Sequence, residues 1–407
     1  MNLESLVLYD KIHQCVTLSG VAAKKGRHTT IKDLGVIENA AVVVDSDTAR
    51  ILWIGKSLEL PQQFKEIVNQ YSCEGEVWLP ELVECHTHLV FAGDRSHDFA
   101  MRSSGKTYTQ IAAEGGGILT TLSQTRQASV QELLERAQID IDRFQKLGVG
   151  TIEIKSGYGL SLESEIKILK CIQTLQQIVS VQLVPTFMPA HAIPPEFKER
   201  SDDYVKLICE EWIPEITKLQ LASYFDVFIE DGYFSVPQAE KLCLTAKDKG
   251  LSIKIHADQF KSLGGTSLAV KLEAQSVDHL DHINREDIKA LSNSPTVAVL
   301  CPGASLFTGT PYAPARELID GGARVALTTD FNPGTCPSRN LPLMTTLACT
   351  QMKMTVAESI AGITYNAAAA LGMENEIGSL EIGKLFRVCQ IKGSSYESLP
   401  YMFGELE

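Results

Sequence analysis

The sequence of 407 residues lacks an excess of positive charge, since its formal net charge at pH 7 is -13. Such a chain has no overall positive field to attract nucleic acid or an anionic membrane surface. It also contains no run of about 18 apolar residues, which excludes a transmembrane helix. We therefore expect neither nucleic acid nor a membrane as a partner, and an anionic substrate would need a local cation.

Two further absences concern the N-terminus and the cysteines. The segment Met1–Leu6 has no basic region followed by an apolar stretch, so we expect no signal peptide. The ten cysteines are scattered, and no two of them form a Cys-x-x-Cys pair. Many have apolar neighbours, which is typical of reduced core residues and predicts a cytoplasmic protein.

A Gly-x-Gly-x-x-Gly turn between a strand and a helix is also missing, which disfavours a doubly wound dinucleotide-binding sheet as the competing fold. From residue 82 onward, short apolar segments instead alternate with amphipathic ones, the pattern of a parallel sheet with crossover helices. Eight such repeats predict an α/β fold of the (β/α)8 TIM-like barrel type. The expected strands are 82–90, 149–155, 181–187, 225–230, 251–256, 276–280, 296–301 and 325–329. The expected helices include 130–146, 162–177, 237–249, 265–272, 284–292 and 313–320.

Both ends of the chain are rich in short strand-like segments separated by turn residues. The simplest arrangement joins them in one sheet unit. We predict a small discontinuous β-sandwich domain of residues 1–75 and 374–407, which flanks a barrel domain of residues 76–373.

Four of the nine histidines fall at the ends of predicted strands, where barrels of this type carry their catalytic groups. His86 and His88 are two positions apart and therefore lie on one face of a strand. His256 and His279 end the fifth and sixth strands, and Asp330 ends the eighth. An ordinary buried role is the alternative for any one of them, but together they predict one Zn²⁺ or iron ion per chain.

These residues lie within longer stretches that resemble a known family. The histidines and Asp330 resemble the amidohydrolase superfamily, whose members hold a metal in a (β/α)8 barrel beside a small β-sandwich. The longer stretches resemble the imidazolonepropionase family within it, and the likeness covers most of the chain. They are His86–Arg95, Glu153–Leu160, Ala190–Pro195, Ile255–Asp258, Asp278–Leu280 and Thr329–Thr335.

The resemblance implies hydrolysis of the cyclic amide of 4-imidazolone-5-propanoate to N-formimidoyl-L-glutamate, in histidine degradation. We interpret His86, His88, His256 and Asp330 as metal ligands. Asp330 would also carry the proton, and His279 would stabilise the oxyanion as the second catalytic residue.

The substrate is a small ring with a carboxylate tail, and it needs its own binding groups. Arg95, on the loop after the first strand, can grip the tail through two parallel hydrogen bonds. Tyr108 is a weaker candidate for the ring. The predicted substrate-binding residues are Arg95, Tyr158, His191, Gln259, Asn332, Gly334 and Thr335.

Three positions bear on the alternatives. Lys155 raises the possibility of two metals bridged by a carboxylated lysine, as in some superfamily members that carry this lysine on the fourth strand. Lys155 lies on the second predicted strand, so we expect one metal. Gln259 stands where related amidohydrolases often carry glutamate, and an amide can only hydrogen-bond the ring. The segment Gly383–Arg387 departs from the usual Gly-Lys-x-Ala-Asp pattern of the superfamily.

Two other functions remain open on the sequence alone. A purine or pyrimidine ring deaminase would share the metal site but would have no use for an arginine that grips a propionate. A non-catalytic protein with the same fold would be expected to lose metal ligands, which this chain retains. The expectation of a homodimer comes only from the resemblance to the family.

Overall fold

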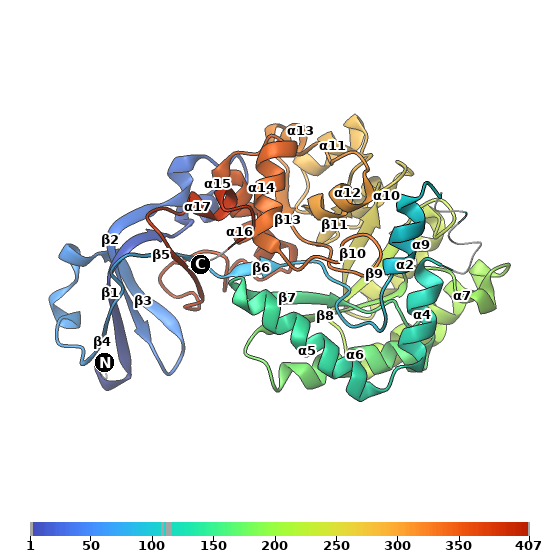
Figure 1. The fold of residues 1–407 in the computed structure, drawn as a ribbon, viewed down its shortest axis with the longest axis horizontal. Coiled ribbons are helices and arrows are strands. Elements are labelled where there is room, and N and C mark those ends of the chain that lie inside the picture. Colours follow the sequence, from blue (N-terminus) through green and yellow to red (C-terminus); the bar gives the residue numbers. More distant parts are fainter. Residues whose placement is uncertain (1–2, 107–109, 111–115, 406–407) are drawn as a thin grey trace.

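The computed structural model describes residues 3–106, 110 and 116–405, which form two sheets and their covering helices (Figure 1). Tyr108 lies outside the described residues. In Figure 1 the smaller sheet lies at one end of the molecule, and helices α2 (Ser96–Ser103) and α4 (Ile118–Gln127) lie at the opposite end.

The larger sheet has eight parallel strands that neighbour one another in chain order. Beyond its two edge strands, Thr87 pairs in parallel with Phe331, and the His88 N–H donates to the Phe331 carbonyl at 2.9 Å. The sheet thereby closes, which confirms the (β/α)8 barrel and excludes the open doubly wound sheet. Its strands are β6 (Leu82–Glu84), β7 (Val149–Lys155), β8 (Gln182–Ala190), β9 (Tyr224–Ile229), β10 (Ser252–Ala257), β11 (Ser276–His279), β12 (Val297–Leu300) and β13 (Arg324–Leu327).

Two predicted strands end at least two residues earlier in the structure than the sequence predicts. The strand expected at 82–90 ends at Glu84, and the strand expected at 325–329 ends at Leu327. Beyond both strands the regular ladder gives way to isolated pairing, such as that of Thr87 with Phe331, beside the polar side chains of His88 and Asp330.

Several crossover helices begin after a serine or threonine whose side chain accepts a hydrogen bond from the first turn. Helix α5 (Val130–Lys146) begins after Ser129, whose side chain and that of Glu132 cap each other's backbone N–H groups. The remaining helices around the barrel are α6 (Leu162–Gln176), α7 (Ser201–Leu207), α8 (Ile213–Lys218), α9 (Val236–Asp248), α10 (Gly265–Lys271), α11 (Arg285–Ser292), α12 (Pro302–Thr308), α13 (Ala315–Gly321), α14 (Leu341–Gln351), α15 (Val356–Gly362) and α16 (Tyr365–Ala370).

The smaller sheet is mixed and has six strands, ordered β14-β5-β1-β2-β3 with β4 paired to β1. Its strands are β1 (Leu6–Val16), β2 (Val36–Asp45), β3 (Arg50–Lys56), β4 (Asn69–Ser72), β5 (Glu76–Pro80) and β14 (Val388–Lys392). Strand β14 pairs antiparallel with β5, so a segment near the C-terminus lies in the N-terminal sheet. Buried Trp78 and Ile12 pack in the apolar layer on this sheet. The domain boundaries themselves stay a prediction.

Two further expectations from the sequence concern buried cysteines and the absence of a transmembrane helix. All ten cysteines are free and nine of them are buried, as expected for core residues. Among the described residues, no helix has both the length and the apolar character needed to cross a bilayer.

Candidate metal and substrate site

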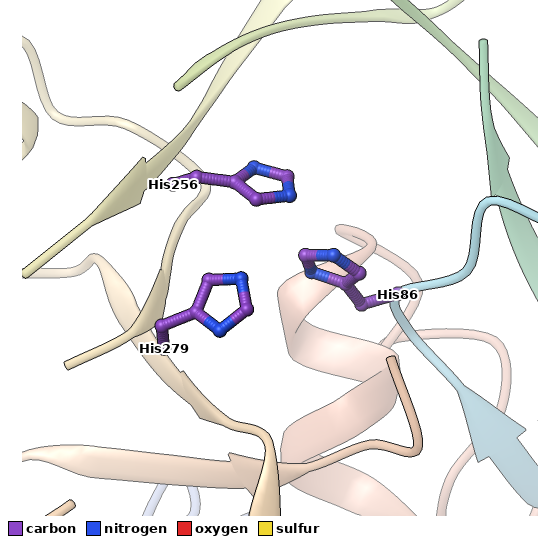
Figure 2. Close-up of side chains that lie close together, drawn as sticks. All are labelled: His86, His256 and His279. Atoms are coloured by element: carbon purple, nitrogen blue, oxygen red, sulfur yellow. The ribbon is translucent and has the colours of Figure 1, made fainter. Parts of the chain in front are cut away.

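The polar residues predicted at the strand ends meet in one buried cluster. Figure 2 shows the imidazoles of His86, His256 and His279 turned toward one another. Candidate ligand atoms of these three lie within 4.8 Å of one another, and so do those of His86, His88 and Asp330. Each of the five side chains is at most 3% exposed. The barrel thus brings together residues that are up to 244 positions apart in the sequence.

The imidazole nitrogens of this cluster fit a metal ion. His86 Nε2, His88 Nδ1, His256 Nε2 and His279 Nδ1 are buried and have no hydrogen-bond partner among the described residues. Burial holds the pKa of His86, His88 and His279 well below the usual range, so these imidazoles are neutral. Neutral imidazole is the form that binds a metal, and a cation at the centre would satisfy nitrogens that are costly to leave unpaired.

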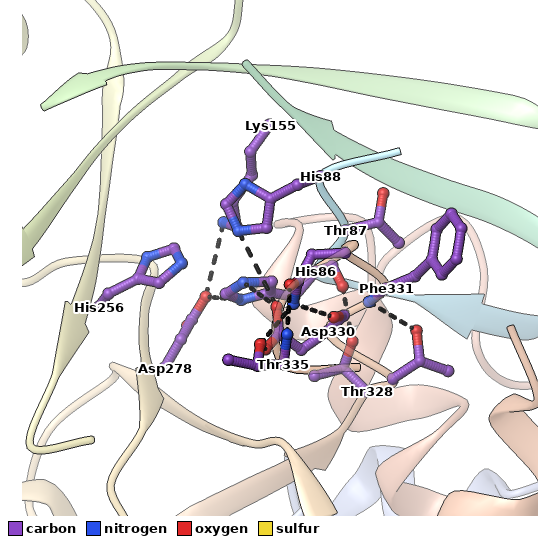
Figure 3. A network of polar contacts seen from close by, with 12 residues as sticks. His86, Thr87, His88, Lys155, His256, Asp278, Thr328, Asp330, Phe331 and Thr335 are labelled. Carbon is purple, nitrogen blue, oxygen red and sulfur yellow. Dashed lines mark hydrogen bonds and ion pairs between the residues drawn. The ribbon is translucent and has the colours of Figure 1, made fainter. Parts of the chain in front are cut away.

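Two aspartates behind the cluster orient the rings. His86 Nδ1 lies 2.6 Å from Asp278 Oδ2 (Figure 3). His256 Nδ1 lies 3.0 Å from Asp226 Oδ1. A carboxylate only accepts hydrogen bonds, so each Nδ1 carries the proton and each Nε2 presents its lone pair inward. Carboxylates in this position fix the tautomer and the orientation of metal-binding histidines.

Lys155 belongs to a buried network of charges beneath the histidines. Its Nζ lies 2.7 Å from Asp226 Oδ2, 3.1 Å from Glu153 Oε1 and 3.5 Å from Asp278 Oδ2. Burial alone would lower the pKa of Lys155, but the carboxylates of Asp226 and Glu153 raise it above its usual value. Lys254 Nζ adds a second cation 2.7 Å from Glu153 Oε2. Lys155 therefore remains an ammonium that balances the aspartates, and β7, its strand, is the second of the barrel as predicted.

Asp330 lies three residues beyond β13 and faces the first histidine pair. Its Oδ1 is 3.4 Å from His86 Nε2 and 3.9 Å from His88 Nε2, and Thr335 Oγ1 donates to its Oδ2 at 3.2 Å. Burial raises the pKa of Asp330 to about 8. Asp330 and His279 both have left-handed backbones, with φ of 54° and 83°. Such strain is common where a side chain must be aimed into a functional site.

A cavity of about 260 Å³ opens above the cluster. His88, His256, His279 and Asp330 contribute to its lining. All seven residues predicted to bind substrate line it as well: Arg95, Tyr158, His191, Gln259, Asn332, Gly334 and Thr335. The structure therefore brings the predicted metal ligands and the predicted substrate residues into one space.

Arg95 and Gly334 are closely fitted on the cavity wall. Arg95 Nε donates to Thr121 Oγ1 at 2.9 Å, and its guanidinium carbon lies 5.9 Å from the centroid of the Tyr158 ring. A Cβ added to Gly334 would lie 2.2 Å from Arg95 Nη1. Glycine at this position leaves the room that the guanidinium occupies.

Asn332 acts mainly within its own loop. Its Oδ1 accepts from the N–H groups of Gly334 and Thr335, both at 2.8 Å, and its Nδ2 donates to Thr335 Oγ1 at 2.6 Å. These bonds fold the loop after Asp330 into a tight turn. The Asn332 side chain therefore stabilises the loop that faces Arg95, and its predicted contact with substrate stays a prediction.

His191 and Gln259 lie on the cavity wall near the histidine cluster. The His191 ring stacks on His88 with centroids 4.6 Å apart, and its Nδ1 bonds to the Gly157 carbonyl at 3.1 Å. Burial lowers the pKa of His191 to about 3, so it is a neutral donor and acceptor. His282 Nδ1 lies 2.9 Å from the backbone carbonyl oxygen of Gln259, and this hydrogen bond helps to hold Gln259 in the wall.

Part of the cavity wall was not predicted from the sequence. Asp98, Phe99 and Arg102 of α2 line it, together with Phe228 and Tyr233. The spacing of positions 95, 98, 99 and 102 is helical and would have shown that they share one face with Arg95. No comparable signal marks the two aromatic residues. Asp226 and Asp278 were detectable as acidic residues inside otherwise apolar strands.

A closed (β/α)8 barrel with a histidine and aspartate cluster at its strand ends is typical of hydrolases of the amidohydrolase type, most of which depend on a metal ion. The model of the Amidohydrolase family matches residues 154–392. An imidazolonepropionase of Bdellovibrio bacteriovorus is 44% identical over 407 residues, which cover 100% of this chain and 95% of the relative. One of Geobacillus kaustophilus is 42% identical and covers 97% of this chain and 93% of the relative. The chain belongs to the imidazolonepropionase family.

Solved structures of low sequence identity share the fold. A triazine hydrolase variant superposes with a TM-score of 0.71 at 14% identity and covers 99% of this chain and 92% of its own. The guanine deaminase of E. coli gives a TM-score of 0.69 at 14% identity, and the match covers 98% of this chain and 91% of the deaminase. An adenosine deaminase from Xanthomonas campestris with bound zinc gives a TM-score of 0.66 at 13% identity. This match covers 95% of this chain and 84% of the deaminase. At these identities the likeness extends to the fold alone.

Proposed function

We propose that this protein hydrolyses the cyclic amide of 4-imidazolone-5-propanoate to N-formimidoyl-L-glutamate. The observation that carries the proposal is the single cavity that joins a metal-type histidine cluster to Arg95. A cyclic amide with a carboxylate tail needs both, because the amide must be polarised and the tail needs a cation. The curated imidazolonepropionases at 44% and 42% identity support the same substrate.

One Zn²⁺ or iron ion per chain would be held by His86, His88, His256 and Asp330. The unpaired ring nitrogens support this set, and nitrogen and oxygen donors suit either metal. When bound, such an ion lowers the pKa of a water molecule toward ~7 and polarises a carbonyl group. The ion pairs of Lys155 leave no free amine to bridge a second ion.

Asp330 and His279 would carry the proton and the developing charge. As the oxygen of water bonds to the ring carbonyl carbon, Asp330 takes the proton of that water. His279 stabilises the oxyanion of the tetrahedral intermediate. Asp330 then returns the proton to the ring nitrogen, and the bond between that nitrogen and the carbonyl carbon breaks. The products of the cleavage are one new carboxylate and one protonated nitrogen, so the atoms of a single water molecule are consumed.

The cavity wall would hold the rest of the substrate. Arg95 grips the propionate, because a guanidinium forms two charge-assisted hydrogen bonds with a carboxylate. Tyr158, His191 and Gln259 surround the ring and hydrogen-bond its polar atoms. Gln259 has no proton to exchange, so its role is confined to binding. Gly334 and Thr335 complete the wall beside Arg95 and Asp330.

The decisive experiment follows the absorbance of the imidazolone after the metal-loaded protein is added. We expect the absorbance to disappear without release of ammonia, because the reaction opens the ring and removes no amino group. Asp330→Asn should fold and yet lose nearly all turnover. Intact absorbance with metal-loaded protein would overturn the proposal. Ammonia release from purine or pyrimidine rings would point to a deaminase, and a protein that binds no metal would point to a non-catalytic relative.

A further inference from the structure

The loop between β7 and α6, residues 156–161, forms part of the cavity wall and carries Tyr158. Tyr158 is 2% exposed, and its ring centroid lies 5.7 Å from that of His88. The loop backbone is left-handed at Gly157, with φ of 105°, and at Leu160, with φ of 45°. A leucine rarely adopts this conformation, and it persists only where the surroundings hold it.

The carboxylate of Glu165 lies directly behind this loop. Its Oε1 accepts hydrogen bonds from the N–H groups of Gly159 and Leu160, both at 2.8 Å, and its Oε2 accepts from Gly157 N–H at 3.0 Å. Glu165 is 0% exposed, and in the described part of the chain no lysine, arginine or histidine forms an ion pair with it. Backbone N–H groups of the loop, together with the Ser156 side chain, therefore supply its hydrogen-bond donors.

Arg126 holds the same loop by its carbonyl groups. Its Nε donates to the Gly159 carbonyl at 2.6 Å, and its Nη2 donates to the Leu160 carbonyl at 3.0 Å. Arg126 Nη1 is anchored in turn by Glu196 Oε1 at 2.5 Å. The loop is thus fixed from both sides, by an acceptor for its amides and by a donor for its carbonyls.

The position of the loop determines two cavity side chains. Tyr158 lies between Gly157 and Gly159, whose amides both bond to Glu165. The Gly157 carbonyl bonds to His191 Nδ1 at 3.1 Å, and a Cβ on Gly157 would lie 2.9 Å from the His191 Cβ. A shift of the loop would therefore move Tyr158 and turn His191 together.

We propose that Glu165 is a positioning residue that fixes Tyr158 and His191 for the substrate through three backbone hydrogen bonds. Glu165 acts through the loop and lies behind it, outside the metal cluster. The proposal rests on the proposed function where it refers to substrate. The hydrogen bonds between Glu165 and the loop do not depend on that function.

The kinetic test uses Glu165→Gln, which keeps the size of the side chain but places an NH₂ donor among backbone donors. Glu163→Gln, on an exposed position of the same helix turn, is the matched control. We expect Glu165→Gln to raise KM on the order of 10-fold, because glutamine keeps one acceptor oxygen and at least one buried N–H group of the loop loses its acceptor. The loss in kcat should be smaller, metal content should not change, and Glu163→Gln should behave as wild type.

A double-mutant cycle with Tyr158→Phe separates positioning from general stability. If Glu165 acts through Tyr158, Tyr158→Phe should raise KM in the wild type and add little in the Glu165→Gln background. Equal effects of Tyr158→Phe in both backgrounds would overturn the proposal, and so would a KM of Glu165→Gln within twofold of wild type. Should Glu165→Gln fail to fold, Arg126→Gln releases the same loop from its carbonyl side and enters the same cycle.

Hydrogen exchange gives a readout that does not depend on turnover. Amides of residues 156–161 should exchange faster in Glu165→Gln than in wild type and Glu163→Gln, while peptides of α5 should not change. Unaltered exchange in the loop would refute the hold of Glu165. If the wild type showed no turnover of the imidazolone, the proposed function would fail, and the exchange result would still decide whether Glu165 fixes the loop.

Discussion

Nδ1 of His86 lies 2.6 Å from Oδ2 of Asp278, and both side chains are completely buried. The two residues stand on different strand ends, 192 positions apart in the sequence. The contact leaves His86 Nε2 as the free nitrogen, and that atom faces the centre of the cluster without a partner among the described residues. Asp278 thus prepares His86 as a ligand without lying at the centre itself.

Asp278→Asn should weaken metal binding on the order of 10- to 100-fold, because the orienting partner of a metal-binding histidine is lost. Competition with a chelator measures the change. Asp231→Asn is the control, since that carboxylate is 66% exposed and pairs with Lys261 on the surface. An unchanged metal affinity in Asp278→Asn would show that Asp278 does not orient a metal ligand.

Metal analysis should give one ion per chain, and added bicarbonate should not increase this number. A bridged pair of ions would need a neutral Lys155 amine that reacts with carbon dioxide. The Lys155 ammonium is instead bound between Asp226 and Glu153, whose charges raise its pKa. Elemental analysis of protein loaded with and without bicarbonate tests this, and two ions per chain would contradict it.

Arg95→Gln should raise KM about 10- to 100-fold with a smaller effect on kcat, since a charge-assisted hydrogen bond contributes about 1.5–3 kcal/mol. Steady-state kinetics on the imidazolone measures the change. Arg143→Gln, at a side chain that is 57% exposed, is the control. A substrate whose carboxylate is esterified should be turned over equally by wild type and variant, and a persistent difference would argue against the carboxylate grip.

Gly334→Ala should lower kcat/KM on the order of 10- to 100-fold, because its methyl group would displace the Arg95 guanidinium. The melting temperature and the metal content should remain close to wild type, since the atom displaced is the end of a flexible side chain. The double variant Gly334→Ala with Arg95→Gln should lose no more than Arg95→Gln alone. Additive losses would show that Gly334 acts by another route.

Much of the candidate site could be predicted because its residues stand at strand ends. The period of apolar residues located the strands, and the histidines and Asp330 followed directly from their positions. The wall formed by α2 was missed, because its residues belong to no motif and the helix is short. The hydrogen bonds by which Asn332 folds its own loop could not be predicted, because such a loop has no signature in sequence.

The sequence by itself determined the barrel, the metal-type residues and the arginine for an acidic tail, because each depends on local pattern and residue chemistry. Only the tertiary structure decided which partners orient them. In the sequence, Asp226 and Asp278 stand out only as acidic residues in apolar strands, and Glu165 does not stand out at all. Their roles arise because closure of the barrel buries them against specific nitrogens, where a carboxylate without hydrogen bonds would be too costly. The same burial ties Lys155 to the aspartates, which favours a single metal ion.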